Sequence, residues 1–269
     1  MLFIISHQLP KSAAKKLQLW QREVDALADY ASRVAEGKRL FQSRNQTKNR
    51  TFVEVRSTLE KMCHGARRCG YCEDSYADEV EHIKPKDLYP EVVFCWENYL
   101  YVCGPCNGPK GNQFAVFPKG AGQKTIVSRR PDAPVDPPVK GSPVFLDPRA
   151  ENPLDYIILD LCGTFFFLPQ AEKGTREYER ADFTINTLRL NKREALVKAR
   201  ENAYSSYRAR LREYCLDKKK GASQEKLDSR MRDLQASPHP TVWHEMKRQR
   251  DLHSELAELF AQVPEAVGW

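Results

Sequence analysis

Two short cysteine motifs, Cys69-Gly70-Tyr71-Cys72 and Cys103-Gly104-Pro105-Cys106, decide the fold of this 269-residue chain. Each motif brings two thiols to one side of a tight turn, and 30 residues lie between Cys72 and Cys103. Two such turns complete a tetrahedral shell around Zn²⁺, and four thiolates leave no open position for a substrate. We therefore expect Cys69, Cys72, Cys103 and Cys106 to bind a structural zinc ion. Free buried thiols and a redox pair are the alternative interpretations.

The remaining four cysteines lack this spacing. Cys63-His64 is a competing ligand pair without a turn motif, whereas Cys95 and Cys162 are expected to pack as small apolar residues. The first five residues have neither the basic start nor the length of a signal peptide, and no apolar run is long enough to span a bilayer. We therefore expect a cytoplasmic protein with reduced thiols and no membrane partner.

The residue types that phosphodiester hydrolysis requires lie between and just after the two cysteine turns: Glu81, His82, Asn98 and Asn107. A histidine is neutral near pH 7 and can take a proton from water, and carboxylate and amide oxygens suit a hard divalent cation. Residues 79–83 are predicted to form a strand, whose adjacent side chains point to opposite faces. The strand must therefore twist for Glu81 and His82 to act on one phosphate. Taken alone, His82 is interpreted as a surface histidine and the asparagines as turn residues; their grouping favours a site.

In this order, C-x2-C, E-H-x-x-P-K, W-x-N-x-L and C-x2-C-N-x-x-K-G resemble the HNH endonucleases of the ββα-metal fold. The resemblance implies that His82 is the general base, that Glu81 and Asn107 hold the catalytic metal ion, and that Asn98 orients the catalytic loop. Glu81 stands where an aspartate is usual, and Asn107 stands where the last histidine is usual. The second change favours Mg²⁺ or Mn²⁺ over Zn²⁺ at the catalytic position.

A narrower resemblance is carried by R-C-G-Y-C-E from Arg68, V-E-H-I-K-P-K from Val80, Y-P at Tyr89 and W-E-N at Trp96. These segments, with F-L-D-P at 145–148 and T-L-R-L-N at 187–191, are similar to the PtuB-like HNH subunits of Septu-type and retron-associated anti-phage systems. The similarity is close over residues 68–111 and implies an effector nuclease that works with a PtuA-like ATPase. Residues 120–125 lack the G-x4-G-K-[ST] spacing of a phosphate loop, so the ATPase must be a separate chain. DNA is the expected substrate; an RNA-cleaving effector, for example on transfer RNA, and a non-catalytic zinc module that binds nucleic acid or a partner are the alternatives.

The formal net charge of +7 is unevenly distributed. Residues 192–254 carry 16 Lys or Arg against nine Asp or Glu, whereas the segment around His82 is locally acidic. Basic helical surfaces bind phosphate backbones, although interleaved acids are also typical of a solvated helix face. We expect the substrate to be bound by Lys84, Lys86, Lys110, Arg200, Arg208 and Arg212.

The periodicity of apolar residues predicts an α+β protein. A small ββα core over the zinc knuckle pair is expected at 63–117, after an N-terminal helical region at 1–62 with helices at 12–36, ended by Gly37, and at 51–62. Seven prolines at 118–148 predict a connector over 118–150. Residues 151–269 are expected to form a hairpin, with strands at 156–161 and 164–168 and Cys162-Gly163 as its turn, followed by a mostly helical region that includes helices at 222–234 and 242–263.

Overall fold

The computed structural model describes all residues 1–269, and about half of them are helical. Its α-helices are α1 (Lys11–Asp25), α2 (Tyr30–Arg44), α3 (Arg50–Lys61), α4 (Gly104–Lys110), α5 (Arg176–Thr187), α6 (Glu194–Lys219), α7 (Gln224–Gln235), α8 (Pro240–Arg248) and α9 (Ser254–Gln262). Its strands are β1 (Glu79–His82), β2 (Tyr99–Val102), β3 (Ala115–Pro118), β4 (Thr125–Ile126), β5 (Gly141–Pro143), β6 (Ile157–Leu159) and β7 (Phe167–Pro169). The strands form three small antiparallel sheets, β1-β2, β4-β3-β5 and β6-β7. The expectation of an α+β protein is confirmed.

The first part of the chain folds into three helices rather than two. The single helix expected at 12–36 is wrong, because Asp29 starts a new helix by accepting a hydrogen bond from the Ser32 amide at 2.8 Å. Gly37 does not end a helix but lies inside α2, where a Cβ atom would come within 3.1 Å of Val93. The helix expected at 51–62 agrees with α3 to within one residue, and Asn49 caps it.

Strands β1 and β2 form a short antiparallel pair, and helix α4 follows β2 directly. Glu79 lies opposite Val102 and His82 lies opposite Tyr99. Cys103 is the residue before α4, and Pro105 occupies its first turn, where its fixed φ favours helix initiation. Helix α4 packs against β1, and α3 packs against β2. The two cysteine turns are thereby held at one end of the β1-β2 pair.

The connector is less irregular than its prolines predict, since β4 and β5 pair with β3 on either side. The hairpin that follows is present as β6 and β7, with Ile157 opposite Pro169. The expectation of a tight turn at Cys162-Gly163 is wrong, because residues 160–166 form a longer loop. The Asp160 carboxylate organises this loop by accepting hydrogen bonds from the Cys162 and Thr164 amides at 2.8 and 2.9 Å.

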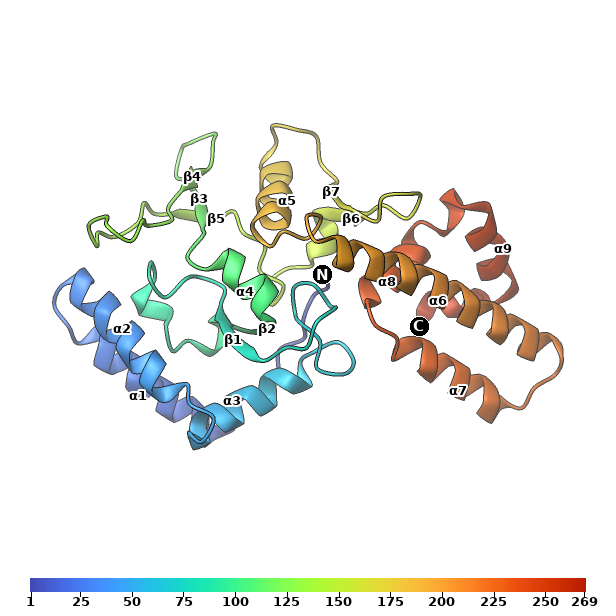
Figure 1. The fold of residues 1–269 in the computed structure, drawn as a ribbon, viewed down its shortest axis with the longest axis horizontal. Helices are drawn as coiled ribbons and strands as arrows, with labels where there is room; N and C mark the ends of the chain where they lie inside the picture. Colours follow the sequence, from blue (N-terminus) through green and yellow to red (C-terminus); the bar gives the residue numbers. More distant parts are fainter.

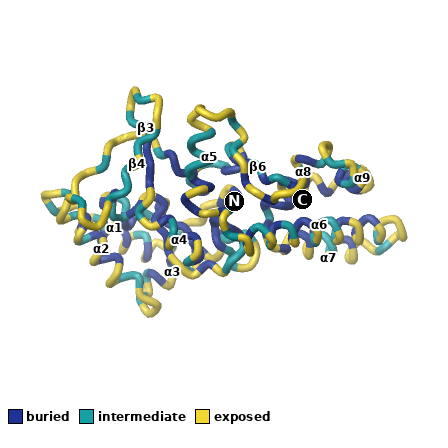
Figure 2. The backbone as a smooth tube through the Cα atoms, turned by 45° about the horizontal axis from the view of Figure 1, so that its top comes forward, coloured by how far each residue is buried: buried dark blue, intermediate teal, exposed yellow.

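The helices gather at the two ends of the molecule (Figure 1). Helices α1 to α3 lie at one end, α6 to α9 lie at the other, and β1, β2 and α4 lie between them. The predicted helix at 222–234 is present as α7, whereas the one at 242–263 is divided into α8 and α9. Buried residues run through both ends in one cluster of 58 hydrophobic side chains, which Figure 2 shows as dark stretches along the tube. None of the helices has both the length and the apolar character required to cross a membrane.

Arg200 lies in this interior and not on a basic surface. Its side chain is 1% exposed and donates to the carbonyls of Phe165 at 3.0 Å and Leu190 at 2.7 Å. Its guanidinium also lies over the Phe167 ring, 4.4 Å from the ring centre. The expectation that Arg200 binds the substrate is therefore wrong, because its donors are enclosed and used to join α6 to the β6-β7 hairpin.

We expect Arg200→Met to lower the free energy of unfolding by about 2 to 4 kcal/mol, because two buried carbonyls lose their donors. Arg208→Met, on the same helix, should cost less than about 1 kcal/mol, because Arg208 is partly exposed and makes a surface ion pair. Urea unfolding of both variants measures the difference. Equal stability of the two would show that the Arg200 hydrogen bonds contribute nothing.

Candidate metal centre and adjoining polar cavity

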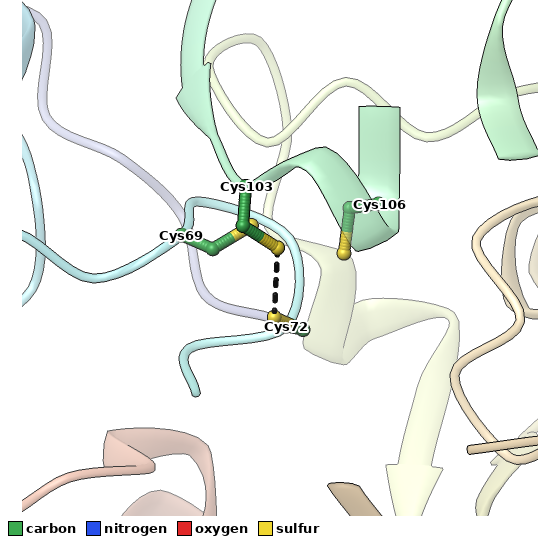
Figure 3. Close-up of side chains that lie close together, drawn as sticks. All are labelled: Cys69, Cys72, Cys103 and Cys106. Carbon is green, nitrogen blue, oxygen red and sulfur yellow. Dashed lines mark hydrogen bonds between the residues drawn. The ribbon is translucent and has the colours of Figure 1, made fainter. Parts of the chain in front are cut away.

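Four cysteine side chains meet at the junction of β2 and α4 (Figure 3). Cys69 and Cys72 come from the loop that precedes β1, and Cys103 and Cys106 come from the start of α4. All four are buried, and their sulfur atoms lie within 4.8 Å of one another. The Sγ atoms of Cys72 and Cys103 are 3.7 Å apart, close to the roughly 3.8 Å expected between two sulfurs that each lie about 2.3 Å from one tetrahedral zinc ion. The cluster therefore fits a zinc knuckle pair.

The other cysteines stand apart from this cluster. All eight cysteines are free thiols, and neither Cys63 nor His64 belongs to the group of four. Cys215 is buried, Cys63 and Cys95 are half-buried, and Cys162 is exposed. The prediction that Cys162 packs as an apolar residue is therefore wrong, because the longer β6-β7 loop carries it to the surface.

The cluster is tied to the C-terminal helices at both cysteine turns. Arg193, at the start of α6, donates from Nη2 to the Cys106 sulfur at 3.2 Å. Glu73, which follows Cys72, accepts hydrogen bonds from the amide of Thr241 at 3.0 Å and from its hydroxyl at 2.6 Å. Thr241 belongs to α8, so both cysteine turns contact the helices at the far end of the chain.

Next to the cluster, β1 directs two carboxylates toward α4. Glu79 and Glu81 are two residues apart on the strand and therefore share a face. Asn107 of α4 donates from Nδ2 to Glu79 Oε2 at 2.5 Å. Glu81 is buried and forms an ion pair with Lys110, whose amine also donates to the His82 carbonyl at 2.9 Å. Burial raises the pKa of Glu81, and the Lys110 charge opposes that rise.

His82 points to the opposite face of the strand and is held on all sides. Its ring packs edge-on against Phe41 and Tyr99, with centroid distances of 4.4 and 5.2 Å. Its Nε2 lies 2.9 Å from the Val93 carbonyl. A carbonyl only accepts, so this contact places the proton on Nε2 and leaves the lone pair on Nδ1. Burial, followed by the nearby Lys86 charge, lowers the pKa of His82 to about 3, so the ring is neutral at pH 7.

Asn98 fixes the loop that follows β1. Its Oδ1 accepts from the Lys84 amide at 2.7 Å, and its Nδ2 donates to the carbonyls of Lys84 at 3.0 Å and Val92 at 3.1 Å. The same loop carries Val93, whose carbonyl orients His82. Asn98 thus ties the start of this loop, at Lys84, to Val92, which precedes the residue that contacts His82, and it does not itself line the cavity.

Glu81, His82 and Asn107 all line one cavity of about 630 Å³, although Glu81 and His82 leave the strand on opposite faces. The cavity lining is mostly polar and includes Glu79, Lys86 and Arg56. The sequence interpretation missed Glu79, whose two-residue spacing from Glu81 was the available signal. It also missed Arg56, for which no local signal exists, because only the tertiary fold brings α3 to the cavity that β1 lines.

Of the residues expected to bind the substrate, only some line the cavity. Lys86 lines the cavity, and Lys84 is exposed but does not line it. Lys110 is fully buried in its pair with Glu81, so the expectation that it meets a phosphate is wrong. Arg208 and Arg212 of α6 both pair with Glu255 of α9, and no residue beyond Asn112 lines the cavity.

The buried four-thiol cluster fits a zinc knuckle pair, and it lies beside a polar cavity that a histidine and several carboxylates line. Over 49 residues, the chain is 49% identical to the Septu protein PtuB of Bacillus thuringiensis. This match covers 16% of the chain and 19% of that protein, so it spans about a fifth of the relative's length. No family model matches the chain, and no solved structure matches it. The short match supports a relation to Septu-type defence proteins.

We expect the purified protein to contain one zinc ion per chain, and Cys106→Ser to lose it, because three thiolates do not close the shell. Loss of the ion should lower the thermal midpoint of unfolding by more than about 10 °C. Elemental analysis and thermal unfolding measure both effects. Cys162→Ser is the matched control, because Cys162 is exposed and outside the cluster. A Cys106→Ser protein with its full zinc content would contradict the assignment.

Proposed function

We propose that the chain is a metal-dependent HNH endonuclease that hydrolyses phosphodiester bonds of nucleic acid. The observation that carries this proposal is the convergence of Glu81, His82 and Asn107 on one polar cavity. The three residues come from β1 and α4, and the four-cysteine cluster holds the start of α4 next to the β1-β2 pair. These are the residues that the HNH motif assigns to catalysis.

His82 is suited to act as the general base. Its neutral form prevails at pH 7, and the Val93 carbonyl directs its proton to Nε2, which leaves Nδ1 to accept a proton from water. The rings of Phe41 and Tyr99 prevent the imidazole from rotating away. Asn98 supports this role indirectly, because it fixes the loop that contains Val93.

Glu81 and Asn107 would hold the catalytic cation, with Glu79 as an additional oxygen donor. The Asn107 amide nitrogen is engaged by Glu79, which leaves the amide oxygen as a ligand atom. Carboxylate and amide oxygens form the donor set that Mg²⁺ or Mn²⁺ prefers. A divalent cation bound here supplies charge neutralisation at the phosphate and at the leaving oxygen.

In the proposed reaction, His82 takes a proton from water, and the resulting hydroxide oxygen forms a bond to phosphorus. The bond from phosphorus to the 3′ oxygen breaks on the opposite side, and the leaving oxygen takes up a proton from solvent. The products are a 5′-phosphate and a 3′-hydroxyl. Lys110 contributes by holding Glu81 and the His82 carbonyl in place and has no contact with the substrate.

We propose DNA as the substrate and anti-phage defence in the cytoplasm as the role, with a PtuA-like ATPase as the partner. The similarity to Septu protein PtuB supports the defence role. The chain has no phosphate loop of its own, so ATP-dependent control would require a second protein. The reduced state that the four thiolates need agrees with a cytoplasmic location.

His82→Ala should reduce nicking of plasmid DNA at least about 100-fold, because proton abstraction from water loses its base. The assay uses the zinc-loaded protein with its ATPase partner, with and without added Mg²⁺ or Mn²⁺, and transfer RNA as a parallel substrate. His7→Ala is the matched control, since His7 is exposed and does not line the cavity.

Full cleavage by His82→Ala would reject the assignment of the base, and metal-independent cleavage would reject the catalytic cation. Cleavage of transfer RNA but not of plasmid would keep the site and change the substrate. The absence of strand breaks under every condition would favour a non-catalytic zinc module.

A further inference from the structure

The cavity at His82 has two walls of opposite character. One wall is acidic and comes from Asp78, Glu79 and Glu81 at β1. The other is built by the N-terminal helices and by the loop after β1, and it contains Asn45, Thr47, Arg56 and Lys86. Its one carboxylate, Asp87, forms an ion pair with Lys38 at 3.3 Å. The first wall suits a cation and repels a phosphate backbone, so a nucleic acid that enters the cavity needs positive charge on the second wall.

Arg56 of α3 is the central cation of the second wall. It donates from Nη1 to Asn45 Oδ1 at 2.9 Å and from Nη2 to the Gln46 carbonyl at 2.8 Å, and both partners are neutral. Arg56 forms no ion pair with a carboxylate, and neither does its neighbour Arg67. The positive charge of Arg67 is close enough to affect the pKa of Arg56. Burial, and then the Arg67 charge, lower the pKa of Arg56. A guanidinium held this way beside a cavity has an unmet preference for an anion.

Lys86 lies at the other edge of the same wall. It belongs to no ion pair, and its amine is 5.6 Å from the centre of the Phe41 ring that packs on His82. It also lines a second cavity of about 380 Å³, which shares Phe41, Asn45 and Lys86 with the first. The second cavity continues along α2 to Gln42 and Lys38, so the two together form a trench that leads away from His82.

We propose that this trench, with Arg56 and Lys86 as its cations that form no ion pair and Asn45 next to Arg56, binds the phosphates next to the one that is cleaved. The inference rests on the proposed nuclease function for the place of the reactive phosphate. It adds Arg56 and Asn45, from the N-terminal helical region outside the HNH motif, to Lys86, which belongs to that motif. Phosphate contacts of this kind fix the position of a strand without reading its bases.

The C-terminal basic helices do not offer an equivalent surface beside the cavity. The Arg200 donors are used inside the protein, and Arg208 and Arg212 share the Glu255 carboxylate. None of these residues lines either part of the trench. The unpaired positive charges that line the cavity with His82 therefore come from residues 56 and 86, although the sequence concentrates its net charge elsewhere.

The test measures binding of a fluorescent 20-nucleotide DNA, single-stranded and duplex, to the zinc-loaded protein without added Mg²⁺ or Mn²⁺. We expect Arg56→Gln and Lys86→Gln each to weaken binding roughly 5- to 20-fold. Each should also reduce the slope of log affinity against log salt by about 0.7 to 0.9. Arg56→Lys should recover much of the affinity, because the charge remains. Lys61→Gln is the control, since Lys61 is an exposed cation of α3 that lines neither cavity.

If Arg56→Gln unfolds, Lys86→Gln alone tests the inference. Lys86 forms no hydrogen bond within the protein, so this variant should remain folded. Unchanged affinity and salt slope in folded Lys86→Gln and Arg56→Gln overturn the inference, as does a wild-type protein that binds no DNA. An equal loss of affinity in Lys61→Gln also overturns it, since the effect would then be one of net charge. Failure of the nuclease proposal is separate: it appears as binding through this trench without cleavage.

Discussion

The structure depends first on the meeting of four thiol groups at the end of the β1-β2 pair. Cys69 and Cys72 approach from one side, and Cys103 and Cys106 approach from the other, so two turns that are 30 residues apart become one cluster. This closure brings the start of α4 next to β1. Because Arg193 contacts the Cys106 sulfur and Glu73 contacts Thr241, the same cluster also anchors the C-terminal helices. An antiparallel pair of four-residue strands has little stability alone, so the packing of the four thiols at its end helps to fix β1, β2 and the start of α4.

Buried polar contacts and aromatic packing then fix the individual side chains of the candidate site. Lys110 joins α4 to β1 through Glu81 and the His82 carbonyl, and Asn98 joins Lys84 to Val92 within the loop that follows β1. Aromatic rings from α2 and β2 then fix the imidazole. Each of these groups lies inside the protein, where an unmet hydrogen bond is costly and the geometry is therefore well defined. The cavity owes its arrangement to buried polar contacts and not to the charge of the surface.

The features that depend on neighbouring residues were predicted correctly from the sequence. The predictions were wrong for side chains whose burial depends on distant segments. The clustering of the four cysteines, the strand at Glu79 and helix α3 follow from spacing, periodicity and caps, which are local. The long first helix was wrong because the Asp29 cap outweighed a continuous apolar pattern. The sequence predicts Lys110 and Arg200 to be exposed, because most lysines and arginines are, whereas both are buried. Only the tertiary fold encloses them and supplies their partners.

What the sequence alone determined about this protein is therefore the four-thiol cluster and the ordered set of Glu81, His82, Asn98 and Asn107 around it. The reason is that metal ligands and their turns require particular residue types at short, fixed spacing. The tertiary structure alone decided which cations face the cavity. Arg56 comes from a helix that shares no motif with β1, and the basic C-terminal region, despite its charge, lines no part of the cavity. Packing between distant segments determines which charges stay unpaired, and this packing cannot be predicted from the local sequence.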